Sequence, residues 1–369
     1  MNRRQLLIGG GGVVALGAGV TLLSAAQMGS ASDYTAATDA MRAPLAAHPD
    51  AREYIRFATL APNGHNTQPW QFTVAPGRIT IAPDRSRRTP VVDPDDHHLF
   101  ISLGSAAENL TLAAAARGTH GQPLFDPAYG GSIGFAHEPG PASPSPLFDA
   151  IPHRQSTRAD YDGRPVNPRD LDLLASAATV PGVDLVLLTD RPRIDRLREL
   201  VTTGNSAQMA DPAFVRELKA WLRFNPHAAL RTGDGLYSVA SGNPALPDWL
   251  GPRAFDWLSS AASQNKTYAA QIDSSAGIAV FVGAAADPAH WVAVGHACQR
   301  FALQATALGL KSAFINQPVE VPALRPHLAA LVGLPGRRPD LVMRFGYGPT
   351  LTRSPRRPVA SVITRAASA

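Results

Sequence analysis

The string LAPNGHNTQPWQF at residues 60–72 combines turn-forming residues with short polar side chains. Proline, asparagine and glycine in such a run favour a tight, exposed turn that presents backbone N–H groups to a planar ligand. We expect Trp70 and Phe72, at the end of the turn, to anchor it in the core. The alternative is a loop whose proline and tryptophan serve packing alone.

The string HRQSTRADY at residues 153–161 places Arg154, Ser156 and Arg158 at alternate positions. Alternate side chains of an extended segment point the same way, so these three can hold a phosphate by charge-assisted hydrogen bonds. The pattern is weak by itself in an arginine-rich chain, where a solvated cluster is the alternative. The pattern supports a phosphate site only in combination with the turn at residues 60–72.

The C-terminal tail carries a further group of cations. Within residues 344–362, RFGYGPTLTRSPRRPVASV, a predicted strand ends at Phe345 and is followed by Arg353, Arg356 and Arg357. For any one of these arginines, the residues alone leave a basic surface tail open.

The first string resembles the flavin loop of the nitroreductase superfamily. The positions that match are Pro62, Asn66, Gln68, Pro69 and Trp70. Asn63 and Gly64 stand where that family usually has serines, and His65 lies inside the loop. The second string resembles the same superfamily's Arg-x-Ser-x-Arg motif, and Arg356 is the best match to the basic residues that complete its phosphate site.

The resemblance implies a binding site for FMN. Residues 307–320, ALGLKSAFINQPVE, are similar to the segment whose backbone meets the isoalloxazine N5, with Asn316 and Gln317 replacing the usual Glu-Gly pair. The full set of implied cofactor-binding residues is Pro62, Asn63, Gly64, His65, Asn66, Gln68, Arg154, Ser156, Arg158, Asn316, Gln317, Arg353, Arg356 and Arg357. No side chain needs to act as a catalytic nucleophile, because flavin N5 carries the chemistry.

An internal repeat points to two related halves. Residues 102–118 and 293–309 are identical at six of 17 aligned positions, at an offset of 191 residues. We interpret this as a duplicated domain whose small-residue helices pack closely across a two-fold axis, the alternative being two unrelated alanine-rich helices. The replacement of the Glu-Gly pair by Asn316 and Gln317 is similar to the two-halved Acg-like branch of the superfamily. The flavin loop occurs only in the first half and the Arg-Ser-Arg motif only in the second. One FMN per chain is therefore expected.

The predicted fold is an α+β, three-layer nitroreductase-like fold, with the halves fused as an intramolecular pseudo-dimer. The first half covers residues 33–146 and ends in a Pro/Gly/Ser-rich linker at 121–146. The second covers 147–369, with a lid over 225–251. Periodicity and turn signals predict helices at 36–57, 102–117, 194–203, 212–224 and 289–308, a hairpin at 70–82, and strands at 184–188, 278–283 and 341–345.

The N-terminal residues have the pattern of a targeting sequence. Arg3 and Arg4 precede residues 5–32, which carry no charge and are rich in glycine. Residues 1–32 resemble a twin-arginine export signal, which predicts the twin-arginine translocase as a partner and a periplasmic or cell-envelope location. The alternative is an uncleaved membrane anchor.

Composition excludes several classes of protein. With 45% hydrophobic and 17% charged residues in 369, the chain can bury a large core, and Cys298 alone permits no disulfide. The net charge of +5 comes from scattered arginines, which argues against nucleic acid binding. The string DPDDHH at 93–98 fits a helix cap in solvent better than a metal site, and residues 130–134 match a hydrolase elbow without its strand-turn-helix context.

These observations predict an FMN-dependent oxidoreductase that passes hydride or electrons through N5 to a small organic acceptor, a nitroaromatic or a quinone. The donor is NAD(P)H, or a quinol or protein partner if the chain is exported. A monomer with an internal two-fold is expected. The alternative is an FMN-binding or storage protein whose lid covers the flavin and blocks turnover.

Overall fold

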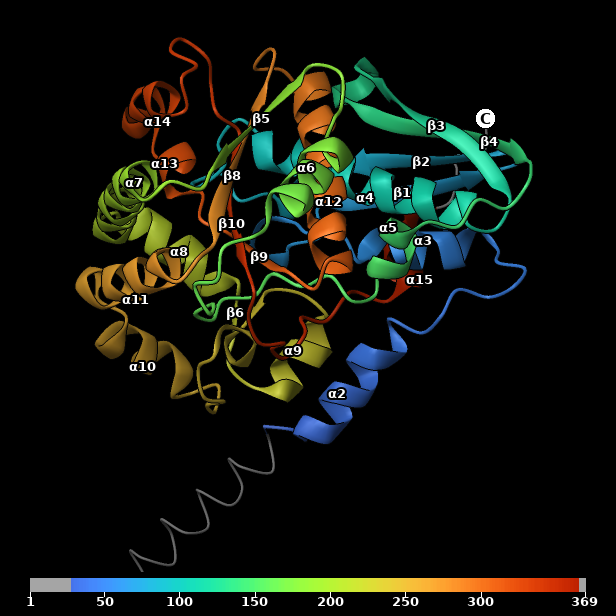
Figure 1. Cartoon of the computed structure of the whole chain (residues 1–369). Coiled ribbons are helices and arrows are strands. Elements are labelled where there is room, and N and C mark those ends of the chain that lie inside the picture. Colours follow the sequence, from blue (N-terminus) through green and yellow to red (C-terminus); the bar gives the residue numbers. More distant parts are fainter. Residues whose placement is uncertain (1–27, 365–369) are drawn as a thin grey trace, which may run out of the picture.

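The computed structural model describes residues 28–364, so most of the predicted export signal lies outside the described residues. Its first sheet has the strand order β11-β1-β2-β4-β3 (Figure 1). These strands are β1 Trp70–Ala75, β2 Arg78–Pro83, β3 Thr119–Asp126, β4 Ser132–Pro139 and β11 Ile363–Thr364. All neighbours pair antiparallel except β11, which runs parallel to β1 and brings the C-terminal tail to the first half.

The predicted hairpin at 70–82 is confirmed by β1 and β2, which turn at Pro76 and Gly77. The helix predicted at 36–57 is two helices, α2 Ala31–Ala40 and α3 Ala51–Thr59, because Pro44 and Pro49 interrupt the pattern. The helix predicted at 102–117 begins earlier, as α4 His97–Ala115.

The linker predicted over residues 121–146 is wrong. Most of it forms β3 and β4, and α5 Pro146–Ala150 follows directly. Pro123 is tolerated because β3 is the edge strand of its sheet, where a missing backbone N–H breaks no ladder bond on the outer side. Proline and glycine content therefore misled the sequence analysis at this point.

The second sheet lies between two layers of helices and has the order β5-β8-β10-β9. Its strands are β5 Val183–Leu188, β8 Gly277–Gly283, β9 Lys311–Phe314 and β10 Leu341–Gly346. On one face Ala279 and Phe281 pack towards α12 Pro288–Ala307. On the other, Ile278 and Val280 pack in a core that also includes residues of α7 Arg191–Ala210, α11 Ala261–Asp273, α13 Gln317–Glu320 and α14 Arg325–Leu331. This alternation on a fully buried strand gives the three layers.

An insertion between α7 and α11, residues 211–260, is called the lid here. It contains α8 Pro212–Ala220, β6 Leu222–Arg223, α9 Pro226–Thr232, β7 Leu236–Tyr237 and α10 Gly251–Leu258. The loop predicted over 225–251 is therefore partly helical. The remaining short helices are α6 Pro168–Ala177 and α15 Val359–Val362. No helix among residues 28–364 is long and apolar enough to cross a bilayer.

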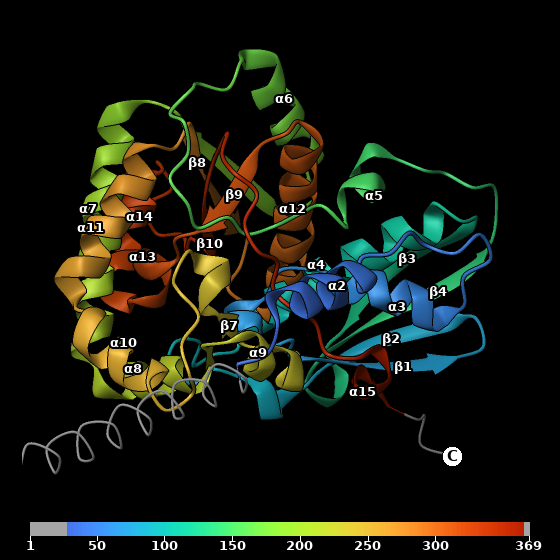
Figure 2. The same cartoon turned by 90° about the horizontal axis from the view of Figure 1, so that it is seen from below.

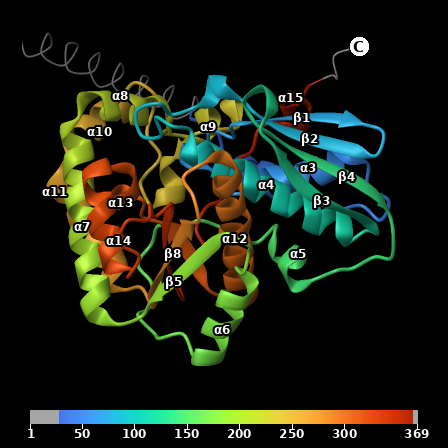
Figure 3. The same cartoon turned by 90° about the horizontal axis from the view of Figure 1, so that it is seen from above.

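Helices α4 and α12 cross between the two sheets (Figures 2 and 3). A Cβ atom added to Gly104 would overlap the carbonyl oxygen of Val292, and one added to Gly295 would overlap that of Ile101. The 191-residue offset of the sequence repeat relates Gly104 to Gly295 and Ile101 to Val292, so the two contacts are equivalent. The predicted close packing of two small-residue helices is thus confirmed.

The same reciprocity holds one turn further along the helices. Arg300 Nη1 donates to Glu108 Oε1 at 2.9 Å, and Gln299 Nε2 donates to Asn109 Oδ1 at 2.6 Å. Residues 108 and 109 correspond to 299 and 300 in the repeat, so the two hydrogen bonds are related by the same offset.

Candidate functional site

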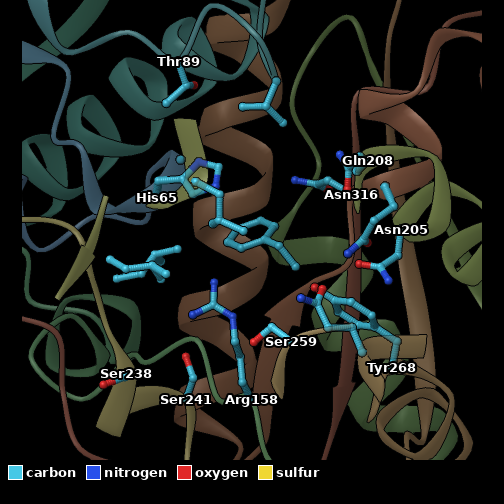
Figure 4. A pocket seen from close by; sticks show the side chains of 18 of the residues that line it. His65, Thr89, Arg158, Asn205, Gln208, Ser238, Ser241, Ser259, Tyr268 and Asn316 are labelled. Atoms are coloured by element: carbon cyan, nitrogen blue, oxygen red, sulfur yellow. The ribbon is translucent and has the colours of Figure 1, made fainter. Parts of the chain in front are cut away.

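A cavity of about 610 Å³ lies between the first half, the second half and the lid (Figure 4). Its walls come from the turn at residues 62–65, from α4, from α7 and α13, and from much of the lid. Cofactor and small-molecule sites typically enclose about 300–1,000 Å³. The cavity is therefore large enough for a cofactor of FMN's class.

The turn predicted from residues 60–72 is present and tightly folded. His65, Asn66 and Gln68 adopt positive φ angles of 48°, 54° and 54°, and Asn63 Oδ1 accepts from the Gln68 N–H at 2.8 Å. Non-glycine residues in this region carry backbone strain, which is concentrated at functional sites. The cavity-lining residues of the turn are Pro62, Asn63, Gly64 and His65. Trp70 and Phe72 are fully buried, as predicted.

Asn66 and Gln68 do not line the cavity. Asn66 Nδ2 donates to the carbonyl oxygens of Gly235 and Pro355, at 3.1 and 3.2 Å. Gln68 Nε2 donates to the Gly233 carbonyl at 2.8 Å. These two side-chain amides bond the turn to the lid and to the C-terminal tail, and so stabilise its conformation on the side away from the cavity.

Arg158 is the one lysine or arginine of the described residues that lines the cavity. Ser238, Ser241 and Ser259 line the same cavity and are labelled with Arg158 in Figure 4. Burial lowers the pKa of His65 to about 4, with the positive charge of Arg158 acting in the same direction. His65 is therefore neutral at pH 7, and Arg158 carries the positive charge in the wall of the cavity.

Arg154 and Arg356 are brought together but lie outside the cavity wall. Arg154 Nη2 donates to the Leu60 carbonyl at 3.1 Å, and Arg356 donates to the carbonyls of Thr59, Leu60 and Ala61. Burial lowers the pKa of both, that of Arg154 to about 10. Their hydrogen bonds fix the backbone of residues 59–61, which leads into the turn. Arg154 Nε is buried without a hydrogen-bond partner.

The other predicted cations and Ser156 also lie away from the cavity. Ser156 forms a β-bridge with Ser312. The Arg353 carbonyl accepts from the Tyr34 hydroxyl, and Arg357 Nη2 donates to the Ser361 carbonyl. Of the Arg-Ser-Arg motif and the tail, only Arg158 is thus presented to the cavity.

Asn316 and Gln317 line the opposite side of the cavity, at the start of α13. Asn316 Oδ1 accepts from the Val342 N–H at 2.9 Å, which fixes the loop against β10. Gln317 Oε1 is buried without a hydrogen-bond partner. Gly204 of α7 makes this position possible, because a Cβ there would lie 2.8 Å from Gln317 Cβ.

Three further residues at this end were missed by the sequence analysis. Glu320 lies one helical turn after Gln317, lines the cavity and accepts from Gln208 Nε2 at 2.6 Å. Burial raises the pKa of Glu320 above the usual range of a carboxyl group. His98 lines the cavity nearby. The three-residue spacing from Gln317 was the only signal available for Glu320.

The DPDDHH string caps α4, as predicted, but only Pro94 and Asp95 of the string are exposed to solvent. Asp93 accepts from the N–H groups of His98 and Leu99, both at 3.0 Å, and His97 Nε2 lies 3.3 Å from Asp340 Oδ1. Asp93, His97 and His98 could together offer a metal ion three ligand atoms. Arg338 acts electrostatically on both histidines and opposes a further cation. Nε2 of both histidines and Oδ1 of Asp340 are buried without a hydrogen-bond partner, so we interpret Asp93 as the cap of α4 and the two histidines as its buried neighbours.

We expect stability to fall in acid partly through His98. Burial, reinforced by His97, lowers the pKa of His98 to about 3, whereas the unfolded chain takes up this proton near its ordinary 6.5. The contribution of neutral His98 to the free energy of unfolding is therefore fully present above pH 6.5. It is lost as pH falls from there toward 3, by about 2 kcal/mol between pH 7 and 5. Urea unfolding at both pH values should show a smaller loss for His98→Gln than for the wild type. The exposed His153→Gln is the control, and an equal loss in all three proteins would contradict the assignment.

A model of the nitroreductase family matches residues 151–348 of the chain. A Mycobacterium tuberculosis protein named as an NAD(P)H nitroreductase, Rv3131, is 27% identical over 333 residues, which cover 85% of this chain and 92% of that protein. The M. tuberculosis protein acg, also named as an NAD(P)H nitroreductase, is 24% identical over 325 residues, covering 84% and 93%.

Among solved structures, the FMN-dependent nitroreductase NfnB of Mycobacterium smegmatis, in complex with NADPH, is 16% identical, with 60% of this chain and 98% of that chain covered at a TM-score of 0.39. The family model and the M. tuberculosis relatives confirm the predicted nitroreductase-like α+β fold and the resemblance to the Acg-like branch. Because the family model matches more than half of the 369 residues, the chain belongs to the nitroreductase family.

Proposed function

We propose that the protein is an FMN-dependent oxidoreductase that binds one FMN in the cavity between its halves. The observation that carries this proposal is the meeting of two half-sites in one cavity. The strained turn at residues 62–65 comes from the first half, and Arg158, with no ion pair among residues 28–364, comes from the second. A cation and a backbone turn in the wall of one cavity suit a ligand with a phosphate and a planar ring.

The donor set fits FMN. Arg158, with the cavity-lining hydroxyls of Ser238 and Ser241, would hold the phosphate. The turn at 62–65 and the Asn316–Gln317 segment would hold the ring from two sides, with the buried and unpartnered Gln317 Oε1 as a free acceptor for a ring N–H. When bound, FMN supplies hydride or electron transfer to a small organic acceptor, which we propose to be a nitroaromatic or a quinone.

We further propose that the chain is a fused dimer. The reciprocal contacts of Gly104 and Gly295, and the related pairs on the next turn of α4 and α12, support an internal two-fold. One complete site then remains, because each half retains only part of it. A single chain supplies its own interface, so a monomer is expected.

Glu320 is proposed as the proton donor to the reduced acceptor. Its carboxyl group lines the cavity one turn from Gln317, and burial raises its pKa. Gln208 Nε2 donates to Oε2 and so fixes the orientation of the carboxyl group. A positioned acid at this place supplies the proton that must accompany a transferred hydride.

The lid supports a second candidate, an FMN-storage protein. Apolar residues of the lid line the cavity, among them Phe214, Leu218, Phe224 and Leu246. A cover of this kind can exclude solvent during turnover or block substrates altogether. Mixing the FMN-loaded protein with NAD(P)H and then with a nitro compound or quinone separates the two candidates. Reduction and reoxidation with turnover exclude storage, and a flavin that only dithionite reduces excludes NAD(P)H as the donor.

Arg158→Ala is expected to weaken FMN binding. Loss of one charge-assisted hydrogen-bonding group at a phosphate costs about 1.5–3 kcal/mol, which corresponds to roughly 10- to 100-fold in Kd. Fluorescence titration of the apoprotein with FMN measures this change. Arg169→Ala, an exposed arginine of α6, should leave the Kd unchanged. An unaltered Kd for Arg158→Ala would remove the phosphate assignment.

A further inference from the structure

We propose that helix α8 of the lid is a gate in the wall of the cavity and that Glu217 is the latch of this gate. Glu217 Oε2 accepts from the Val91 N–H at 2.9 Å, and Oε1 accepts from the Val92 N–H at 3.0 Å. One carboxylate of the lid thereby holds two consecutive backbone N–H groups of the first half. Movement of α8 then controls how fast a ligand enters and leaves the cavity.

The latch lies at the edge of the cavity and not inside it. Phe214 and Leu218, one helical turn apart on α8, line the cavity, and Val92 lines it from the first half. Glu217 follows Phe214 by three residues but is not part of the lining. Its carboxylate therefore joins the lid to the first half beside the cavity, without contacting a ligand held there.

Helix α8 is the mobile side of this contact. No residue of α8 is fully buried, and elements with few buried apolar contacts open at a low cost in free energy. Within residues 28–364, the hydrogen bonds of α8 to the first half are the two accepted by Glu217. Asp211, with φ of −91° and ψ of 112°, separates α8 from α7. At the other end, the Arg87 guanidinium lies 5.4 Å from the Trp221 ring. The middle of α8 is thus held to the first half by Glu217.

The loop that receives the latch is the fixed side. The Asp93 N–H donates to the Thr89 carbonyl at 2.8 Å, which closes the loop on itself. The Asp93 carboxylate accepts from the N–H groups of His98 and Leu99, both at 3.0 Å, and so holds the loop to α4. These bonds do not involve the lid. The loop therefore presents its two N–H groups to a carboxylate as a preformed, charge-assisted contact.

Asp256 provides a matched control on the same helix. Lys219 Nζ of α8 donates to both carboxylate oxygens of Asp256, each at 2.8 Å, but Asp256 belongs to α10. This pair therefore joins two helices of the lid and does not reach the first half. The Asp256 side chain is 51% exposed, and ion pairs of this kind contribute little to stability. Its removal takes a carboxylate contact from α8 without touching the latch.

The test measures the association and dissociation rate constants of FMN with the full-length chain by stopped-flow fluorescence. We expect both rate constants to rise about 10-fold in Glu217→Ala, because hydrogen bonds to a charged group are lost. The Kd should stay unchanged, since the latch closes the empty and the loaded cavity alike. Glu217→Gln keeps one acceptor oxygen and should show a smaller rise. Asp256→Ala should have the rate constants of the wild type.

Unchanged rate constants in Glu217→Ala would overturn the proposal, as would an equal rise in Asp256→Ala. A faster dissociation alone, with a weaker Kd, would also overturn it, because Glu217 would then support the bound ligand instead of gating its passage.

Hydrogen exchange of the apoprotein gives a readout that does not require FMN. The amides of residues 213–220 should exchange faster in Glu217→Ala than in the wild type or in Asp256→Ala. Equal exchange in the three proteins would contradict the gate, even in a chain that binds FMN normally. Faster exchange in a chain that takes up no FMN would support the gate and contradict the proposed function alone.

Discussion

The Glu320→Gln variant is expected to retain its FMN but to lose about 100-fold or more in kcat with a quinone or nitroaromatic acceptor, the usual contribution of a positioned acid. Glutamine preserves the size of the side chain and can still bond to Gln208, so the cavity is kept while the proton is removed. Steady-state kinetics with saturating acceptor, together with the FMN content, measure the effect.

The pH dependence distinguishes a proton donor from a structural role. Because burial raises the pKa of Glu320, the wild type should keep its activity to higher pH than an ordinary carboxyl group allows and lose it as pH rises through that value. This limb should be absent in Glu320→Gln. Glu199→Gln, an exposed glutamate of α7, is the control. An unchanged kcat and pH profile in Glu320→Gln would exclude the proposed role.

Gly104→Ala is expected to destabilise the protein by about 1–2 kcal/mol, because overpacking a tight contact costs about 1–3 kcal/mol. The added Cβ would overlap the Val292 carbonyl where α4 crosses α12. Alanine favours an unconstrained helix by about 1 kcal/mol relative to glycine, so the helix effect alone has the opposite sign. Urea unfolding of the apoprotein measures the sum.

Two related variants sharpen this prediction. Gly295→Ala should destabilise by a similar amount, because its contact with Ile101 is the reciprocal of the first. Gly64→Ala meets no atom within 4 Å and should leave stability unchanged. A stabilised Gly104→Ala protein would mean that the helices do not cross at these glycines.

The sequence predicted those features that depend on neighbours along the chain. The turn at 62–68 follows from its own asparagines and glycine, and the β1–β2 hairpin from Pro76 and Gly77. The α4–α12 contact is long-range, and it was predictable only because the repeat left Gly104 and Gly295 in register.

The part of the site that could not be predicted depends on contacts distant in sequence. Glu320 meets Gln208 across 112 residues, and nothing local distinguishes either side chain. Arg154 and Arg356 match positions of the family's motifs, yet their guanidinium groups donate hydrogen bonds to the carbonyls of residues 59–61. A motif specifies which groups are available, and the fold decides which of them reach the cavity.

The most direct test of the central claim is the absorbance spectrum of the purified native protein, combined with FMN stoichiometry after denaturation. The two half-sites in one cavity predict the bands of an oxidised flavin and one FMN per chain, with occupancy reduced in Arg158→Ala. A protein that contains no flavin and takes up none from added FMN would contradict the account, as would two FMN molecules per chain.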